Sequence, residues 1–150
     1  MAHVRQQILT AVKALLDAVV SAPWRSVHVS PFVPPKAAMP CLLLYHVGET
    51  SADAGLIGVR RQERAMTMAV QIVMPAPANP GNIPVTLDLA ASAIETALPL
   101  SALQAYAEDI AYLGDEPNYE PDDQGYVSDT LSWSISFSTR EGRPDTLGTN

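Results

Sequence analysis

Residues Tyr126–Thr139 read YVSDTLSWSISFST, and this stretch decides the fold because its side chains alternate in character with a period of two. One face would carry Leu131, Trp133, Ile135 and Phe137. The opposite face would carry Ser128, Thr130, Ser132, Ser134, Ser136 and Ser138. This pattern is typical of a strand in an antiparallel sheet that has one buried face and one wet face.

Other stretches supply the partners that such a strand needs. Gln62–Met74 alternates in the same way, with four large apolar side chains on one face. Cys41–Val47 is apolar on both faces, which is typical of a central strand. Ser26–Ser30 is predicted as a short strand, and Ile110–Leu113 as another whose extension to Glu116 is left open.

Two amphipathic helices are predicted. Ala2–Val20 repeats apolar residues at spacings of three and four, and Pro23 blocks its continuation. Pro84–Leu98 has a similar stripe and ends before Pro99, with another helical turn or two expected over Leu100–Tyr106. Together with the strands, these helices predict an α+β fold in which two helices pack on one face of a mostly antiparallel sheet, as a two-layer sandwich.

Composition sets the class of the protein. The chain has 150 residues, 16 acidic and 9 basic, and a net charge of −7, which argues against tight sequence-specific binding to nucleic acid. We expect one domain over residues 1–139 and a flexible tail over 140–150. Cys41 is the single cysteine, so an internal disulfide and a zinc site of several thiolates are excluded. No apolar run is long enough for a membrane span, and we expect a soluble protein made in the cytoplasm.

Motifs for catalysis or cofactor binding are absent from the sequence. It contains no GxGxxG, GxxxxGK[ST], HExxH or GxSxG pattern. Cys41 and His46 are five residues apart on one predicted strand, so they would point to opposite faces. His28 stays open as a partner for either residue, but a lone histidine is more often a packing residue. We therefore expect no catalytic, metal or cofactor site and no enzymatic activity.

Two charged segments suggest an intermolecular contact. Gly48–Arg61 is predicted as a long loop ordered by a neighbour, and an arginine cluster lies where it meets the next strand. Eight acids lie between Glu108 and Asp129, with no lysine or arginine between Ser101 and Thr139. Opposite charges on neighbouring copies attract, which predicts a head-to-tail subunit contact. The predicted interface residues are Arg60, Arg61, Arg64, Leu56, Ile57, Asp115, Glu116, Asp122 and Asp123. A solvated acidic loop without any partner is the simpler alternative.

The order of these segments resembles the tail terminator, or tail completion, family of long-tailed bacteriophages (minor tail protein U-like). The resemblance lies in the HVRQQILTAVKALL helix, the VHVSPFVPPKAAMPCLLLYHVGET segment, RRQERAMTMAVQIVM and the closing TLSWSISFSTREG strand. It is a likeness of segment order over most of the chain, and it carries no catalytic motif.

The resemblance implies a structural virion protein, assembled in the host cytoplasm, that forms a hexameric ring on the completed tail tube. Such a ring halts polymerisation of the tube protein and joins the tail to the head-side connector, while DNA passes through its lumen without specific binding. Two alternatives stay open at this point. One is another neck component, such as a head–tail connector or stopper. The other is a small-molecule-binding or enzymatic α+β domain that uses Cys41, His28 or the acidic loop.

Overall fold

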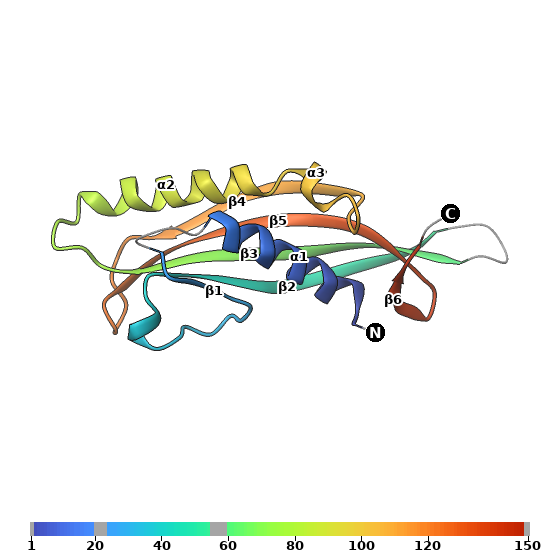
Figure 1. Cartoon of the computed structure of the whole chain (residues 1–150), viewed down its shortest axis with the longest axis horizontal. Coiled ribbons are helices and arrows are strands. Elements are labelled where there is room, and N and C mark those ends of the chain that lie inside the picture. Colours follow the sequence, from blue (N-terminus) through green and yellow to red (C-terminus); the bar gives the residue numbers. More distant parts are fainter. Residues whose placement is uncertain (1, 20–23, 55–59, 149–150) are drawn as a thin grey trace.

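A computed structural model describes residues 2–19, 24–54 and 60–148 of the chain. Nearly half of these residues belong to one six-stranded sheet, with helices on one side of it (Figure 1). The helical elements are α1 (Val4–Val19), a 3₁₀ turn η1 (Lys36–Ala38), α2 (Asn82–Ala97) and α3 (Leu100–Leu103). The strands are β1 (Ser26–His28), β2 (Cys41–Ala54), β3 (Arg61–Pro75), β4 (Asp109–Asn118), β5 (Tyr126–Arg140) and β6 (Arg143–Leu147).

The strand order is β1-β2-β3-β5-β4, and β6 also pairs with β5. Neighbouring strands run antiparallel except for β1 and β2, which are parallel. The register between β3 and β5 is unbroken over the whole length of both strands, from Arg61 opposite Arg140 to Pro75 opposite Tyr126. These two strands form the centre of the sheet.

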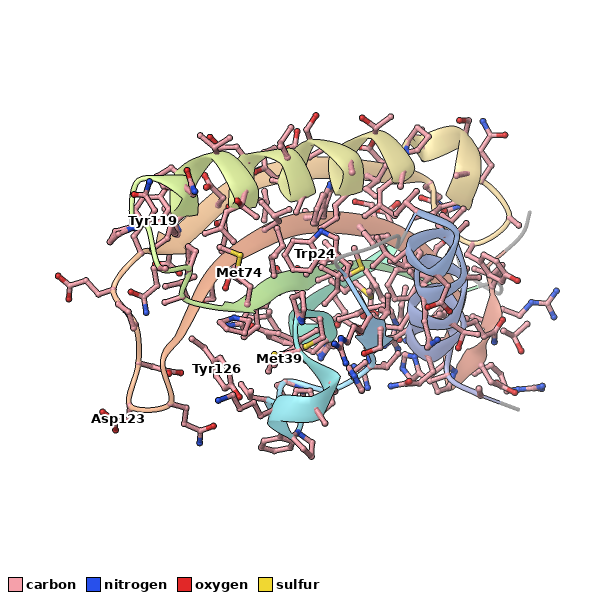
Figure 2. The ribbon with its side chains drawn as sticks, turned by 60° about the vertical axis from the view of Figure 1, so that its left-hand side comes forward. Trp24, Met39, Met74, Tyr119, Asp123 and Tyr126 are labelled. Carbon is pink, nitrogen blue, oxygen red and sulfur yellow. The ribbon has the colours of Figure 1, made fainter. Side chains whose placement is uncertain are left out.

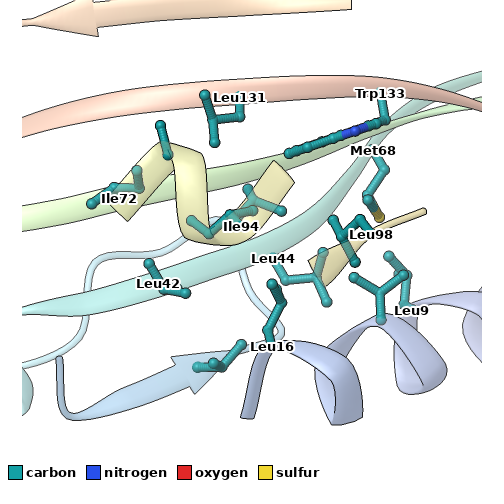
Figure 3. Packing of buried hydrophobic residues seen from close by; sticks show 14 of the residues in the cluster. Leu9, Leu16, Leu42, Leu44, Met68, Ile72, Ile94, Leu98, Leu131 and Trp133 are labelled. Atoms are coloured by element: carbon teal, nitrogen blue, oxygen red, sulfur yellow. The ribbon is translucent and has the colours of Figure 1, made fainter. Parts of the chain in front are cut away.

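The main core lies between the helices and the concave face of the sheet (Figure 3). Strand β5 presents its apolar set to this core, as its alternation predicts: Leu131, Trp133, Ile135 and Phe137 are all buried. The predicted helix over residues 2–20 is confirmed as α1, and its Val4, Ile8, Val12 and Leu16 enter the same core. Leu42, Leu44, Met68 and Ile72 come from the neighbouring strands, and Ile94 from α2.

The predicted two-layer sandwich, with two helices packed on one face of the sheet, is wrong. The sheet curls into a half-barrel and carries three α-helices among the described residues. Long strands accumulate twist, and β2 and β4 each contain an irregularity, between His46 and Gly48 and between Tyr112 and Gly114, of the kind that bends a strand. A second apolar cluster of Met39, Cys41, Leu43, Val73 and Tyr126 also covers part of the opposite face.

Two segments expected to be irregular are strands. Most of the predicted loop Gly48–Arg61 is sheet, because β2 continues to Ala54 and β3 begins at Arg61. The Ser and Ala residues of this segment have only modest strand propensity. The segment is extended because it pairs with β3, with Thr50 opposite Ala65 and Ala52 opposite Glu63. Arg143–Leu147, which lies within the segment expected as a flexible tail, forms β6 and pairs with the end of β5.

The Trp133→Ala variant tests the face assignment of β5. Trp133 is 3% exposed and its ring centroid lies 5.3 Å from that of Tyr112. Loss of the Trp133 side chain leaves a cavity in the main core. We expect the free energy of unfolding to be about 3–5 kcal/mol lower than that of the wild type. Urea denaturation followed by circular dichroism measures this, with Val85→Ala on the exposed side of α2 as a near-neutral control. A Trp133→Ala variant as stable as the wild type would mean that this face is not the core.

Candidate functional site

The β2–β3 hairpin and the turn between β4 and β5 lie at opposite ends of the sheet (Figure 1), and each holds part of the predicted interface. Arg60 and Arg61 are at the free end of the β2–β3 hairpin, whereas Asp122 and Asp123 are in the turn between β4 and β5. Fourteen residues of β5 separate the two ends, which is roughly 45 Å at the usual rise of a strand. Leu56 and Ile57 lie outside the described residues, so the structure does not bear on them.

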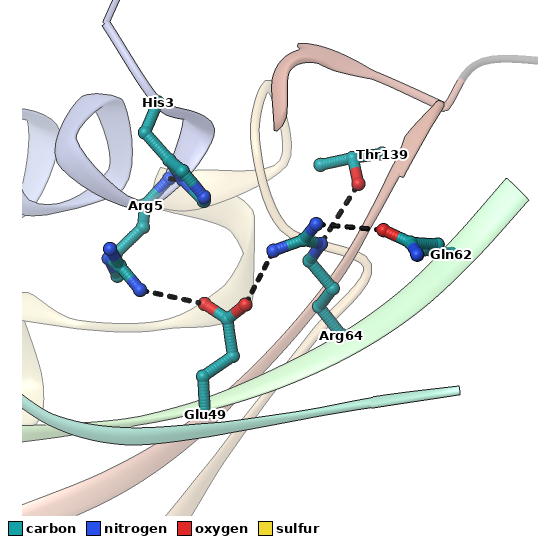
Figure 4. A network of polar contacts seen from close by, with 6 residues as sticks. All are labelled: His3, Arg5, Glu49, Gln62, Arg64 and Thr139. Carbon is teal, nitrogen blue, oxygen red and sulfur yellow. Dashed lines mark hydrogen bonds and ion pairs between the residues drawn. The ribbon is translucent and has the colours of Figure 1, made fainter. Parts of the chain in front are cut away.

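Arg64 has a role within the chain. Its guanidinium donates hydrogen bonds to a Glu49 carboxylate oxygen at 2.7 Å, to Gln62 Oε1 at 2.8 Å and to Thr139 Oγ1 at 2.9 Å (Figure 4). Arg5 of α1 reaches the other Glu49 oxygen at 3.4 Å. Because Arg64 and Glu49 are mostly buried and fully engaged, this network ties α1 to the base of the hairpin and leaves Arg64 unsuited to an external contact.

Arg60 and Arg61 are much less constrained than Arg64. Arg60 is 68% exposed and lies 3.5 Å from Glu141, while Arg61 lies 3.2 Å from Glu63. Exposed ion pairs of this kind contribute little to stability and are readily exchanged for better ones. The hairpin end therefore presents two arginines that a partner can engage.

The acidic turn at the other end has a partly structural role. The Asp122 Oδ1 atom accepts hydrogen bonds from the backbone N–H groups of Gln124 and Tyr126, both at 2.9 Å, and Gly125 has a φ of 80°. Asp122 thus stabilises the turn in the manner common for aspartate. Asp123 lies at the tip of this turn (Figure 2) and is exposed.

Asp115 belongs to an acidic cleft between α2 and strands β4 and β5. The cleft has a volume of about 360 Å³. Four carboxylates and a tyrosine hydroxyl make the lining of the cleft acidic. They belong to Asp88 and Glu95 of α2, Tyr112 and Asp115 of β4, and Asp129 of β5. Glu116, the neighbour of Asp115, is exposed outside the cleft.

Asp129 is the most unusual residue of the acidic cleft. It is 2% exposed, and its Oδ1 atom is buried without a hydrogen-bond partner among the described residues. Burial raises the pKa of its carboxyl to about 6, and the charge of Asp115, a hydrogen bond with the Asp115 carboxyl, and the charges of Asp88 and Glu95 add to this rise. Burial and the same negative surroundings, chiefly Glu95 and Asp115, raise the pKa of Tyr112 to about 12.

The sequence contains a signal for this cleft that the predictions above missed. Asp129 is in phase with Val127 and Leu131, so the alternation of β5 places a carboxylate on the buried face. Asp88 and Glu95 were not recognised as members of the site, because they reach it only when α2 packs over β4 and β5.

The residues considered for catalysis do not converge. Cys41 lies in the apolar cluster on the convex face, where burial raises the pKa of its thiol to about 11. His46 pairs with Met68 of the main core, so it lies on the opposite face of the sheet from Cys41. His28 Nε2 lies 2.7 Å from the Ser26 hydroxyl oxygen. Within the described ranges no three acidic, histidine or cysteine side chains are placed to hold a metal ion.

Comparisons with known proteins give little further information. No protein-family model and no curated protein matches the chain. Among solved structures, the chain is similar to one from the virion of a native gene transfer agent particle, with 12% sequence identity and a TM-score of 0.45 over 87% of this chain and 94% of that chain. A likeness at this level carries no argument about function. Among the described residues, no helix combines the length and apolar character that crossing a bilayer requires.

The Asp129→Asn variant tests the electrostatics of the acidic cleft. A folded-state pKa raised above the unfolded value means that the carboxyl favours the folded state when protonated. The protonated carboxyl therefore contributes fully to the stability of the fold below about pH 4, and this stabilisation is lost as the pH rises through about 6. The asparagine side chain would be neutral throughout, so we expect the variant to have a higher Tm than the wild type at pH 8, by a few degrees, and an equal or lower Tm at pH 4.

Thermal unfolding at both pH values measures this effect, with the exposed Asp123→Asn as the control of equal charge change. The groups that face Asp129 are Asp88 and Glu95 from α2 and Tyr112 and Asp115 from β4. Equal Tm differences for the two variants at pH 8 would contradict a buried, uncompensated carboxylate.

Proposed function

We propose that this chain is a structural virion protein that assembles head to tail into a closed ring, caps the phage tail tube, stops its polymerisation and joins the tail to the head-side connector. The observation that carries the proposal is the separation of charge along one sheet. Arg60 is highly exposed at the hairpin end, and the cleft carboxylates, which have no basic partner within the described ranges, lie roughly 36 Å away along the sheet. The two ends of one molecule are too far apart to meet, so complementarity of this kind is satisfied between copies.

The acidic end also favours a head-to-tail arrangement over a symmetric one. Strand β4 forms an edge of the sheet, and it carries Asp109, Asp115, Glu116 and Pro117. Two such edges repel each other, and proline and a strand irregularity further impede their pairing. A contact between unlike ends is heterologous, and heterologous contacts generate rings when the rotation closes.

The surface charge suits a passage for DNA. With a net charge of −7, a ring of these chains would lack the many phosphate contacts that make DNA binding tight. The dispersal of Cys41, His46 and His28 argues for a structural protein over the enzymatic alternative.

Reversal of the hairpin charges tests the assembly. We expect the wild-type chain to form closed oligomers in mass photometry at low salt, and the variant Arg60→Glu/Arg61→Glu to be monomeric with an unchanged circular dichroism spectrum. The matched control, Arg25→Glu/Lys36→Glu, makes the same charge change at two exposed residues away from the hairpin end and should assemble normally.

Electron microscopy with tail tubes then tests the position of the ring. Rings on tube ends that halt tube growth support the terminator role. Rings that bind the connector but not the tube would indicate another neck component. A monomeric wild-type chain, with or without tubes, would contradict the proposal.

A further inference from the structure

The acidic cleft carries negative charge that the described part of the chain does not neutralise. The six ion pairs of the described residues involve Glu49, Glu63, Glu141, Asp17 and Asp145 as acids. None of the four cleft carboxylates is among them. No lysine or arginine occurs between Ser101 and Thr139. Strand β4, and all of β5 except Arg140, therefore carry no basic residue that could neutralise the cleft carboxylates.

Asp129 points to a missing ligand. Buried polar atoms are almost always hydrogen bonded, and an unpaired one costs stability. Asp129 lines the cleft, is almost fully buried, and leaves Oδ1 unpaired among the described residues. A cationic donor in the cleft would pair this atom and would also offset the repulsion between the carboxylates of Asp129 and Asp115.

The spacing of the carboxylates in the cleft favours an organic cation over a metal ion. Among the described residues, which include all four of its acids, no three are close enough together to coordinate a metal. A guanidinium group has five N–H donors in a planar fork, so it can bridge carboxylates that lie apart. Tyr112 lines the same cleft, and its ring packs against that of Trp133. An arginine side chain therefore fits the cleft by charge and by number of donors.

We propose that the acidic cleft of one copy binds the Arg60 side chain of the next copy. Arg60 is highly exposed and has one weak ion pair among the described residues. Arg64 is held inside its network, and the stem of Arg61 lies against Gly148. The partner of Asp129 in the sheet, Ile72, is eleven residues from the start of β3, so roughly 36 Å separates the cleft from the hairpin end of the same copy. The inference rests on the head-to-tail ring proposed above.

A double-mutant cycle tests the pairing. Asp88 and Glu95 are exposed at the rim, so Asp88→Asn/Glu95→Gln should fold normally. We expect this variant and Arg60→Gln each to raise the dissociation constant of the subunits at least tenfold, and the combination to add almost nothing further. The matched control, Glu116→Gln/Glu120→Gln, removes the same charge from exposed acids outside the cleft and should have a several-fold smaller effect.

Carboxyl ¹³C NMR gives a second readout that a purely structural role would not change. Bound Arg60 favours the ionised form, so the pKa of Asp129 should fall on assembly of the wild type and stay raised in Arg60→Gln. By linkage, subunit affinity should increase as the pH rises through about 6.

The possible failures are distinguishable. Rings that assemble with unchanged affinity in Asp88→Asn/Glu95→Gln overturn the role of the cleft and leave the ring proposal standing. Additive effects in the cycle overturn Arg60 as the donor. A chain that does not self-associate at all overturns the ring and the inference together.

Discussion

Strand β5 is hydrogen bonded to β3, β4 and β6, and its alternating side chains determine which face of the sheet the helices cover. Its register with β3 runs unbroken from one end to the other. A slip of one residue would turn Trp133 and Phe137 outward and bring serines into the core. The loss of buried apolar area would be large, so this one alternation holds the position of the helices, the hairpin and the acidic cleft.

The same constraint accounts for the burial of Asp129. The residue lies in the buried phase of β5, between Val127 and Leu131, and α2 packs over that face. The chain cannot expose this carboxylate without changing the register of the entire strand. Binding sites often contain residues that lower the stability of the fold. Asp129 is such a residue, because it places a carboxylate among buried apolar side chains.

The sequence predicted local features better than the shape of the sheet. Helix α1 and the buried face of β5 can be predicted from the spacing of apolar residues, because each pattern lies within one continuous segment of the chain. The half-barrel curvature, the extension of β2 to Ala54 and the strand β6 depend on pairing between distant segments, which periodicity does not encode. Arg64 joined the arginine cluster by sequence proximity, but Glu49, Gln62 and Thr139 enclose it. Asp88 and Glu95 likewise required the packing of α2.

The Arg64 network fixes the position of the charged hairpin end relative to the rest of the molecule. Arg64 and Arg5 both bind Glu49, so the base of the β2–β3 hairpin is tied to α1 and the hairpin end is held at a defined distance from the core. An arginine on a loose loop would lose conformational freedom on binding, whereas one carried by a braced hairpin loses less. At the other end, α2 and β5 hold the carboxylates of the cleft in place. In the head-to-tail ring proposed above, a rigid body that carries Arg60 and the acidic cleft roughly 36 Å apart would set the angle between successive copies, and this angle decides whether a head-to-tail chain closes into a ring.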